Sequence, residues 1–191
     1  MKNLFLSPFC LMFLMLAPQL QANDFELGLS SETAQLTFRS DSSLIGWGGA
    51  DLGFGVFYND TDDVIGQMSI FQARQASEQS RMTFGVGIRA YAGRLDAISE
   101  NIVSLAIGGE IRYTFPGVMP MSAYFQVFFA PKITSFADAE EVRDYLLGFQ
   151  IEALPQTVAF VGIRHLEFDT EDVSGYQADD EHLHIGVRLT F

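Results

Sequence analysis

The chain has almost no cysteine and few basic residues, and both shortages restrict what it can be. Its 191 residues include a single cysteine, Cys10, which excludes a disulfide scaffold and a thiolate metal site. Eleven Lys and Arg residues stand against 24 Asp and Glu residues, giving a net charge of -13, and this deficit argues against binding to nucleic acid. Aromatic residues make up 13% of the chain and charged residues only 18%, which excludes intrinsic disorder.

Long apolar runs are also scarce, and the main one lies at the N-terminus. Lys2 precedes an apolar run over residues 4–16, and a small-to-polar segment follows it as far as Ala22. These three parts are typical of a secretory signal peptide over residues 1–22, which leaves one domain over residues 23–191. A membrane-spanning helix needs about 20 apolar residues, and neither this run nor any later stretch is long enough.

The rest of the chain alternates between apolar residues and polar or small ones. Successive side chains of a β-strand point to opposite faces, so this period of two predicts two-faced strands. The two faces are least distinct in residues 64–74 and 157–168. We predict ten strands, at about residues 24–29, 34–39, 50–58, 64–74, 81–92, 102–114, 122–132, 143–153, 157–168 and 182–191.

The polar face of these strands carries mainly Gly, Ala, Ser, Thr and Gln with isolated charges, which is unusual for a surface in water. A soluble sheet places ordinary charged residues such as Lys and Glu on its polar face. Small residues and nearly balanced single charges suit a confined lumen, where charges must pair or stay hydrated. The predicted lumen charges are Glu26, Arg39, Asp51, Arg89, Glu110, Arg112, Glu152, Arg164 and Arg188.

An apolar outer face around a polar lumen predicts an all-β, antiparallel, up-and-down transmembrane β-barrel. Ten strands are predicted, with eight as the alternative if residues 24–39 form one interrupted strand and one weak segment is not a strand. Longer polar connections, such as 133–142 and 169–181, alternate with shorter ones such as 154–156, which matches the long outside loops and short periplasmic turns of bacterial barrels. A soluble lipocalin-like barrel would need the reverse pattern, with an apolar lumen and a polar exterior.

The final strand has an apolar outer face and ends in an aromatic residue. It resembles the signal by which the barrel-assembly machinery recognises proteins for insertion into the Gram-negative outer membrane. Together with the signal peptide, it predicts the cell outer membrane as the location, with outer-membrane lipid and lipopolysaccharide as the surroundings. The residues that carry the insertion signal are Leu183, Ile185, Val187, Leu189 and Phe191.

Several short motifs follow one another in the second half of the chain. They are Tyr124, Ala130-Pro131, Tyr145, Gly148-Phe149, Val161-Gly162-Ile163-Arg164 and His184-Ile185-Gly186-Val187, before the terminal Phe191. On these motifs, the chain from about Ala123 onward resembles the YfaZ family of outer-membrane proteins. The N-terminal half matches that family only in its rhythm and its glycine-rich strands. The resemblance implies a small barrel without assigned chemistry, and therefore no catalytic residues and no cofactor.

Acidic residues gather in the predicted connections between strands. Seven carboxylates occur from Glu167 to Glu181, and further clusters occur over 60–63 and 138–144. A negative field attracts cations, and hard cations prefer oxygen ligands, so a weak Ca²⁺ or Mg²⁺ site is one hypothesis for the longest loop. The alternative is a set of solvated loops that provide solubility and charge repulsion. The residues of the hypothetical cation-binding loop are Asp169, Glu171, Asp172, Asp179, Asp180 and Glu181.

His182 and His184 share one face of the last predicted strand and could reach one metal ion. Two ligands at positions i and i+2 without a fixed third partner are a weak signal, so no metal site is predicted. An enzyme would use the same cluster, with Asp179, Asp180 and His182 positioning a water and Ser174 acting as the nucleophile. A nucleophile needs a base within hydrogen-bonding reach, and residues spread over a loop do not guarantee that contact.

These patterns predict an integral outer-membrane barrel protein with a structural role or a narrow solute or ion pore. One alternative is an outer-membrane protease or lipid-modifying enzyme with its site at the extracellular rim, and another is a cation-dependent surface-adhesion protein. A ten-stranded barrel lies between small barrels filled by side chains and large open porins. We therefore expect low conductance, with Arg89, Arg112 and Arg164 pairing with Glu110 and Glu152 across the lumen.

Overall fold

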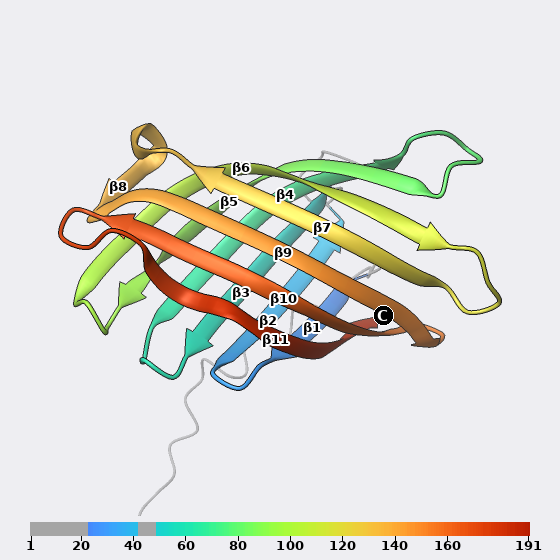
Figure 1. The fold of residues 1–191 in the computed structure, drawn as a ribbon. Coiled ribbons are helices and arrows are strands. Elements are labelled where there is room, and N and C mark those ends of the chain that lie inside the picture. Colours follow the sequence, from blue (N-terminus) through green and yellow to red (C-terminus); the bar gives the residue numbers. More distant parts are fainter. Residues whose placement is uncertain (1–22, 42–48) are drawn as a thin grey trace, which may run out of the picture.

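The computed structural model describes residues 23–41 and 49–191, so the predicted signal peptide lies outside the described residues. Ten strands form one closed antiparallel barrel (Figure 1). A 3-10 turn, η3 (Lys132–Thr134), and a short strand, β8 (Ser135–Ala137), are added to it. The barrel strands are β1 (Asp24–Leu29), β2 (Thr33–Asp41), β3 (Asp51–Asn59), β4 (Val64–Gln75), β5 (Met82–Leu95), β6 (Glu100–Phe115), β7 (Met121–Ala130), β9 (Ala139–Leu154), β10 (Thr157–Thr170) and β11 (Tyr176–Thr190).

Closure follows directly from the strand pairing. Each barrel strand pairs with its neighbours in the chain, and β1 pairs with β11 from Asp24↔Thr190 to Leu29↔Ile185. β7 pairs directly with β9, because β8 turns aside and pairs with β6. Asn23 and Phe191 exchange two backbone hydrogen bonds of 3.0 Å, so the two ends of the described barrel meet. We call their end of the barrel the proximal end and the opposite end the distal end. The prediction of ten barrel strands is confirmed.

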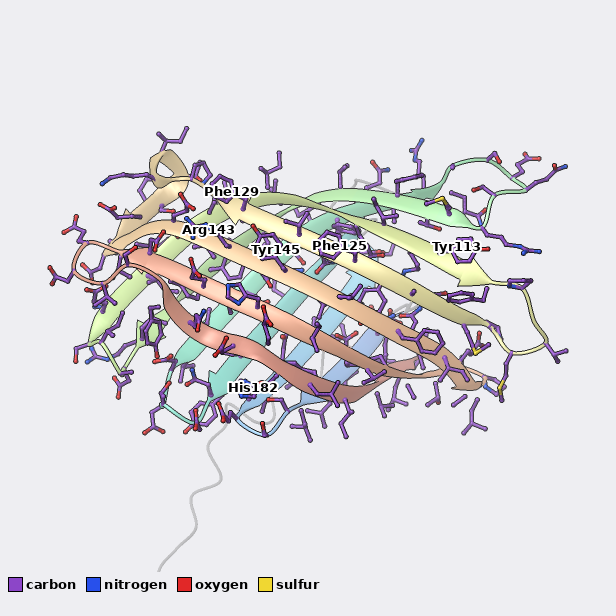
Figure 2. The ribbon with its side chains drawn as sticks, in the orientation of Figure 1. Tyr113, Phe125, Phe129, Arg143, Tyr145 and His182 are labelled. Atoms are coloured by element: carbon purple, nitrogen blue, oxygen red, sulfur yellow. The ribbon has the colours of Figure 1, made fainter. Side chains whose placement is uncertain are left out.

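The predicted alternation places apolar side chains on the outside of the barrel. Figure 2 shows Tyr113, Phe125 and Phe129 projecting from its outer surface, and each is more than a third exposed. Other exposed outward residues include Leu27, Phe54, Val86, Ile107, Leu147 and Val187. Within residues 23–41 and 49–191, no helix is long and apolar enough to cross a membrane.

The strands extend further at the distal end than the sequence predicts. β9 begins at Ala139 and β11 at Tyr176, so the loop predicted over residues 169–181 shortens to 171–175. The predicted contrast between long and short connections is wrong, since residues 42–50 separate the proximal ends of β2 and β3. The early start of β11 is hidden in the sequence by irregular pairing. Two register shifts insert extra residues in β11 relative to β10, and Glu181 takes a positive φ of 54°. These β-bulges hide the strand from a search for strict alternation.

The interior is not polar throughout, which corrects the predicted lumen. Its distal half is filled by apolar side chains that project inward from β3 to β11. Four of the largest, Phe57, Tyr91, Phe128 and Phe168, have an exposed fraction of at most 1%. Tyr91 and Phe168 meet edge to face, with their ring centroids 6.1 Å apart. We call this cluster the distal plug; its members are Phe57, Ile65, Tyr91, Leu95, Ile102, Ala106, Phe128, Ala130, Ala139, Val142, Leu166, Phe168 and Ala178.

Inward glycines make room for inward aromatic rings on the neighbouring strand. A Cβ added at Gly148 would lie 2.4 Å from the Cζ of Tyr124, which is its cross-strand partner. Gly186 faces the ring of Phe160 in the same way. Phe160 is thus an apolar residue on the inward face of β10, which is why apolar and polar residues do not alternate clearly in that strand. Two further cross-strand pairs of this kind are Phe71 with Gly87 and Phe128 with Gly108. The glycine-rich face therefore accommodates large rings rather than leaving the lumen open.

Candidate functional site

A polar cavity of about 270 Å³ occupies the proximal half of the barrel. A smaller space of about 80 Å³ adjoins it near the middle of the barrel and shares several of its lining side chains. We call the two spaces together the vestibule. Its charged and amide side chains include Glu26, Arg39, Arg89, Glu110, Arg112, Gln126 and Arg188.

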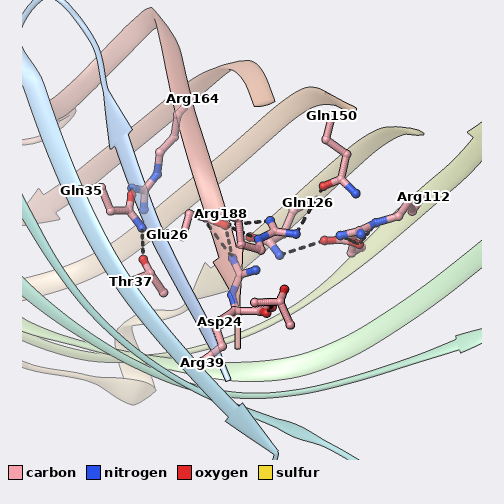
Figure 3. A network of polar contacts seen from close by, with 12 residues as sticks. Asp24, Glu26, Gln35, Thr37, Arg39, Arg112, Gln126, Gln150, Arg164 and Arg188 are labelled. Atoms are coloured by element: carbon pink, nitrogen blue, oxygen red, sulfur yellow. Dashed lines mark hydrogen bonds and ion pairs between the residues drawn. The ribbon is translucent and has the colours of Figure 1, made fainter. Parts of the chain in front are cut away.

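Glu26 is the centre of the first cluster in the vestibule wall, where β1, β2 and β11 meet (Figure 3). Both Nε and Nη2 of Arg188 lie 2.7 Å from Oε2 of Glu26. Nη2 of Arg39 lies 3.2 Å from the same oxygen. Two guanidinium groups therefore share one carboxylate at the seam that closes the barrel.

Glu110 is the centre of a second cluster, on β6 and β7. Nε of Arg112 donates to Oε1 of Glu110 at 2.9 Å, and Nε2 of Gln126 donates to Oε2 at 3.3 Å. The Arg112 guanidinium lies 5.5 Å from the centroid of the Tyr124 ring, within range of a cation–π contact. The carboxylate and the ring hold Arg112 against the wall while part of its guanidinium stays open to the cavity.

Asp144 is the centre of a third cluster, between the vestibule and the distal plug. Nε and Nη2 of Arg164 donate to its two oxygens at 2.9 and 2.8 Å, and Nη1 of Arg89 donates at 2.7 Å. The hydroxyl of Tyr91 in the plug also donates to Asp144, at 2.7 Å. The side chains of Asp144 and Arg164 are only 2% and 4% exposed, so this ion pair is sealed from solvent, whereas Arg89 also borders the vestibule.

The three clusters account for seven of the nine predicted lumen charges. The remaining two, Asp51 and Glu152, are exposed near the proximal end. The predicted pairing of Arg89 and Arg164 with Glu110 and Glu152 is wrong, because both arginines bind Asp144. Asp144 belongs to the acidic cluster of residues 138–144, but β9 begins at Ala139 and points this carboxylate inward. A single buried carboxylate between two arginines is a contact that alternation alone does not reveal.

The acidic residues of the hypothetical cation-binding loop do not converge on one point. Asp169 stands next to Arg143, with an Oδ2 to Nη2 distance of 3.2 Å. Asp179 is fully buried in the interior, with Oδ2 2.7 Å from Nε2 of His184. The other four are exposed, in the turn or along the bulged part of β11: Glu171, Asp172, Asp180 and Glu181. Across the described parts of the chain, no group of three or more His, Cys, Asp or Glu residues could hold a metal ion.

The residues of the rim-enzyme alternative are separated as well. The Ser174 hydroxyl donates to Oδ1 of Asp169 at 2.9 Å rather than to a histidine. Nε2 of His182 lies 3.2 Å from Oε2 of Glu32, and Asp179 lies on the other side of the imidazole at 3.9 Å. The required contact between nucleophile and base is therefore not formed by these residues.

Acidic residues at the distal end take part in closing the barrel. The buried Asp63 accepts hydrogen bonds from the backbone N–H of Asp96 at 2.7 Å and from the hydroxyl of Tyr176 at 2.6 Å. Asn59 donates to Asp63 and to the carbonyl of Ala178, at 2.9 and 3.1 Å. These bonds join the β3–β4 and β5–β6 connections to β11 above the distal plug.

The outer surface near the distal end carries ion pairs that the sequence pattern does not indicate. Arg143, labelled in Figure 2, pairs with Glu141, Glu167 and Asp169. On the connection between β7 and β9, Lys132 pairs with Glu140, and the hydrogen bond to this carboxylate raises the pKa of Lys132 above its usual value. The outward side chains therefore change from apolar to charged toward this end.

Comparison with known proteins gives similarities of fold alone. Neither a protein-family model nor a curated protein matches the chain, so the resemblance to the YfaZ family stays a prediction. Two similar solved structures are the outer membrane channel DcaP of Acinetobacter baumannii and an anion-selective porin from Comamonas acidovorans, each 11% identical. The alignments cover 87% and 92% of this chain, with TM-scores of 0.43 and 0.36. The chain spans only about half the length of these proteins, 54% and 57%. At these TM-scores the similarities support no conclusion about activity or selectivity.

Proposed function

We propose that this protein is an integral outer-membrane β-barrel whose lumen is closed at the distal end and open as a vestibule at the proximal end. The apolar exterior supports membrane insertion, because a closed barrel satisfies its backbone hydrogen bonds inside a bilayer. The predicted signal peptide and the outward row that ends at Phe191 support the outer membrane of a Gram-negative cell. In this proposal the proximal end faces the periplasm, and the barrel-assembly machinery inserts the chain into lipid and lipopolysaccharide.

The distal plug is the observation that supports a closed lumen. Its large side chains are fully buried, and the Asp144 network seals the space beneath them. An ion would have to displace packed rings and then pass a solvent-excluded cluster of charges, and both steps are costly. The proposed function is therefore structural, with at most a very small conductance, rather than that of an open porin.

Single-channel recording in planar bilayers tests this proposal. We expect no stable current steps from the wild-type barrel. The double substitution Phe128→Ala and Phe168→Ala removes two rings of the plug and should produce measurable steps. The matched control is Phe125→Ala with Phe129→Ala, which removes two rings from the outer surface and should leave the barrel closed.

Large, steady currents from the wild-type protein would contradict a closed lumen. Location is tested separately, by migration before and after boiling of the protein from outer-membrane fractions. An intact membrane barrel should change its migration on boiling. Recovery of the protein only from the soluble periplasmic fraction would contradict the membrane assignment itself.

A further inference from the structure

The three clusters of the vestibule wall contain more arginines than carboxylates. Glu26 is shared by Arg39 and Arg188, and Asp144 is shared by Arg89 and Arg164. Only Glu110 and Arg112 form a balanced pair. The three clusters thus contain five arginines and three carboxylates, an excess of two positive charges.

This excess lies within the barrel wall, where charges are poorly screened. Two further carboxylates, Asp24 and Asp51, line the proximal part of the cavity, and Asp24 is the cross-strand partner of Arg39. Asp24 is also engaged by the Thr190 hydroxyl, which donates to it at 2.7 Å. With Asp24 and Asp51 included, the five arginines are matched by five carboxylates, so the excess belongs to the three clusters and not to the whole cavity. An anion is therefore favoured only where a guanidinium group turns free donors toward the cavity.

Two of the five arginines are placed to contact such an anion. The side chains of Arg39 and Arg112 are 34% and 26% exposed, and both line the cavity. Arg89 and Arg164 are more enclosed, and they donate further hydrogen bonds to Gln126 and Gln35, respectively. The planar guanidinium group matches the paired oxygens of a carboxylate or phosphate.

We propose that the vestibule is a binding site for a small oxyanion, a carboxylate or phosphate group held between Arg39 and Arg112. The hydroxyl of Tyr124, whose ring lies beside Arg112, stands in the same wall. Among the described residues, the site opens toward the proximal end, because the Asp144 network and the distal plug close the other side. The proposal goes beyond the closed-barrel function and does not depend on it.

Calorimetric titration of the folded barrel in detergent tests the site, with sodium phosphate and sodium succinate as separate probes at low ionic strength. We expect saturable binding of at least one probe, and the comparison of the two identifies which oxyanion group is preferred. Arg39→Gln and Arg112→Gln should each weaken that binding by about tenfold, because each removes a charge-assisted contact. Arg81→Gln is the matched control, since Arg81 is exposed in the proximal turn before β5 and should leave the affinity unchanged.

A second variant separates binding from mere maintenance of the fold. Glu110→Gln removes the carboxylate that competes for Arg112, so it should tighten oxyanion binding several-fold. If Glu110 served only to hold the wall in place, Glu110→Gln would weaken or abolish oxyanion binding. Each variant is first checked for the wild-type change in migration on boiling. Absence of binding of both probes to the folded wild-type barrel would overturn the proposal, as would equal affinities in wild type, Arg39→Gln and Arg112→Gln.

Discussion

The two halves of the barrel interior are built by the same strands and yet differ in kind. Along β6, the inward residues Ile102 and Ala106 belong to the distal plug, whereas Glu110 and Arg112 line the vestibule. All four share one face of the strand and differ only in their height in the barrel. The alternation of a strand therefore decides which side chains enter the lumen, but not whether the lumen is filled or left open.

The two halves differ in the groups that face each inward side chain across the lumen. In the distal half, rings from separate strands meet one another and exclude water, which stabilises the barrel through burial of apolar surface. In the proximal half, charged groups meet partners or the cavity, and arginines such as Arg39 keep contact with solvent. We therefore expect substitutions in the sealed half to cost more stability than equivalent ones in the vestibule.

The largest effect is expected from Asp144→Ala. This change leaves Arg89 and Arg164 without their carboxylate in a sealed part of the barrel, which should cost about 3–5 kcal/mol of unfolding free energy. The comparison variant is Glu26→Ala, which should cost less because Arg39, one of its two arginines, is 34% exposed and remains able to reach water. Urea unfolding of both variants from lipid vesicles measures the difference. Equal losses would mean that the two halves are equally hydrated.

A second comparison uses neighbouring rings on opposite faces of β7. Phe128→Ala opens a cavity in the distal plug and should cost about 3–5 kcal/mol of unfolding free energy. Phe129→Ala removes a ring from the outer surface, where lipid can fill the space, and should cost clearly less. The same unfolding assay provides the measurement, and a larger loss for Phe129→Ala would refute the assignment of a packed distal core.

The smallest effect tests the pairing of glycine with an aromatic ring in the vestibule wall. The Cβ of Gly148→Ala would overlap the Tyr124 ring, so the substitution should cost about 1–3 kcal/mol. In a Tyr124→Ala background most of that cost should disappear, because the three atoms nearest the added Cβ all belong to the Tyr124 side chain. A double-mutant cycle measures the coupling, and strictly additive losses would show that the backbone, not the ring, requires the glycine.

Most of the strand pattern could be predicted, whereas much of the candidate site could not. The start of β1 and the outward row of β11 from Leu183 to Leu189 follow from alternation alone. The early start of β11 was missed because its bulges near Glu181 break the period of two. The distal plug was missed because an inward apolar residue and an outward one carry the same local signal when the neighbouring strands are unknown.

The sequence by itself determined an all-β chain of ten two-faced strands with an apolar outer surface. It could do so because the direction of a side chain from a strand depends only on the parity of its position. Only the tertiary structure decided that Asp144 joins Arg89 and Arg164, which are 55 and 20 residues away in the chain. Asp144 and Arg164 lie on the adjacent strands β9 and β10, and barrel closure places Arg89 of β5 across the lumen from them. It is that meeting, rather than any local pattern, that separates the sealed distal half from the charged vestibule.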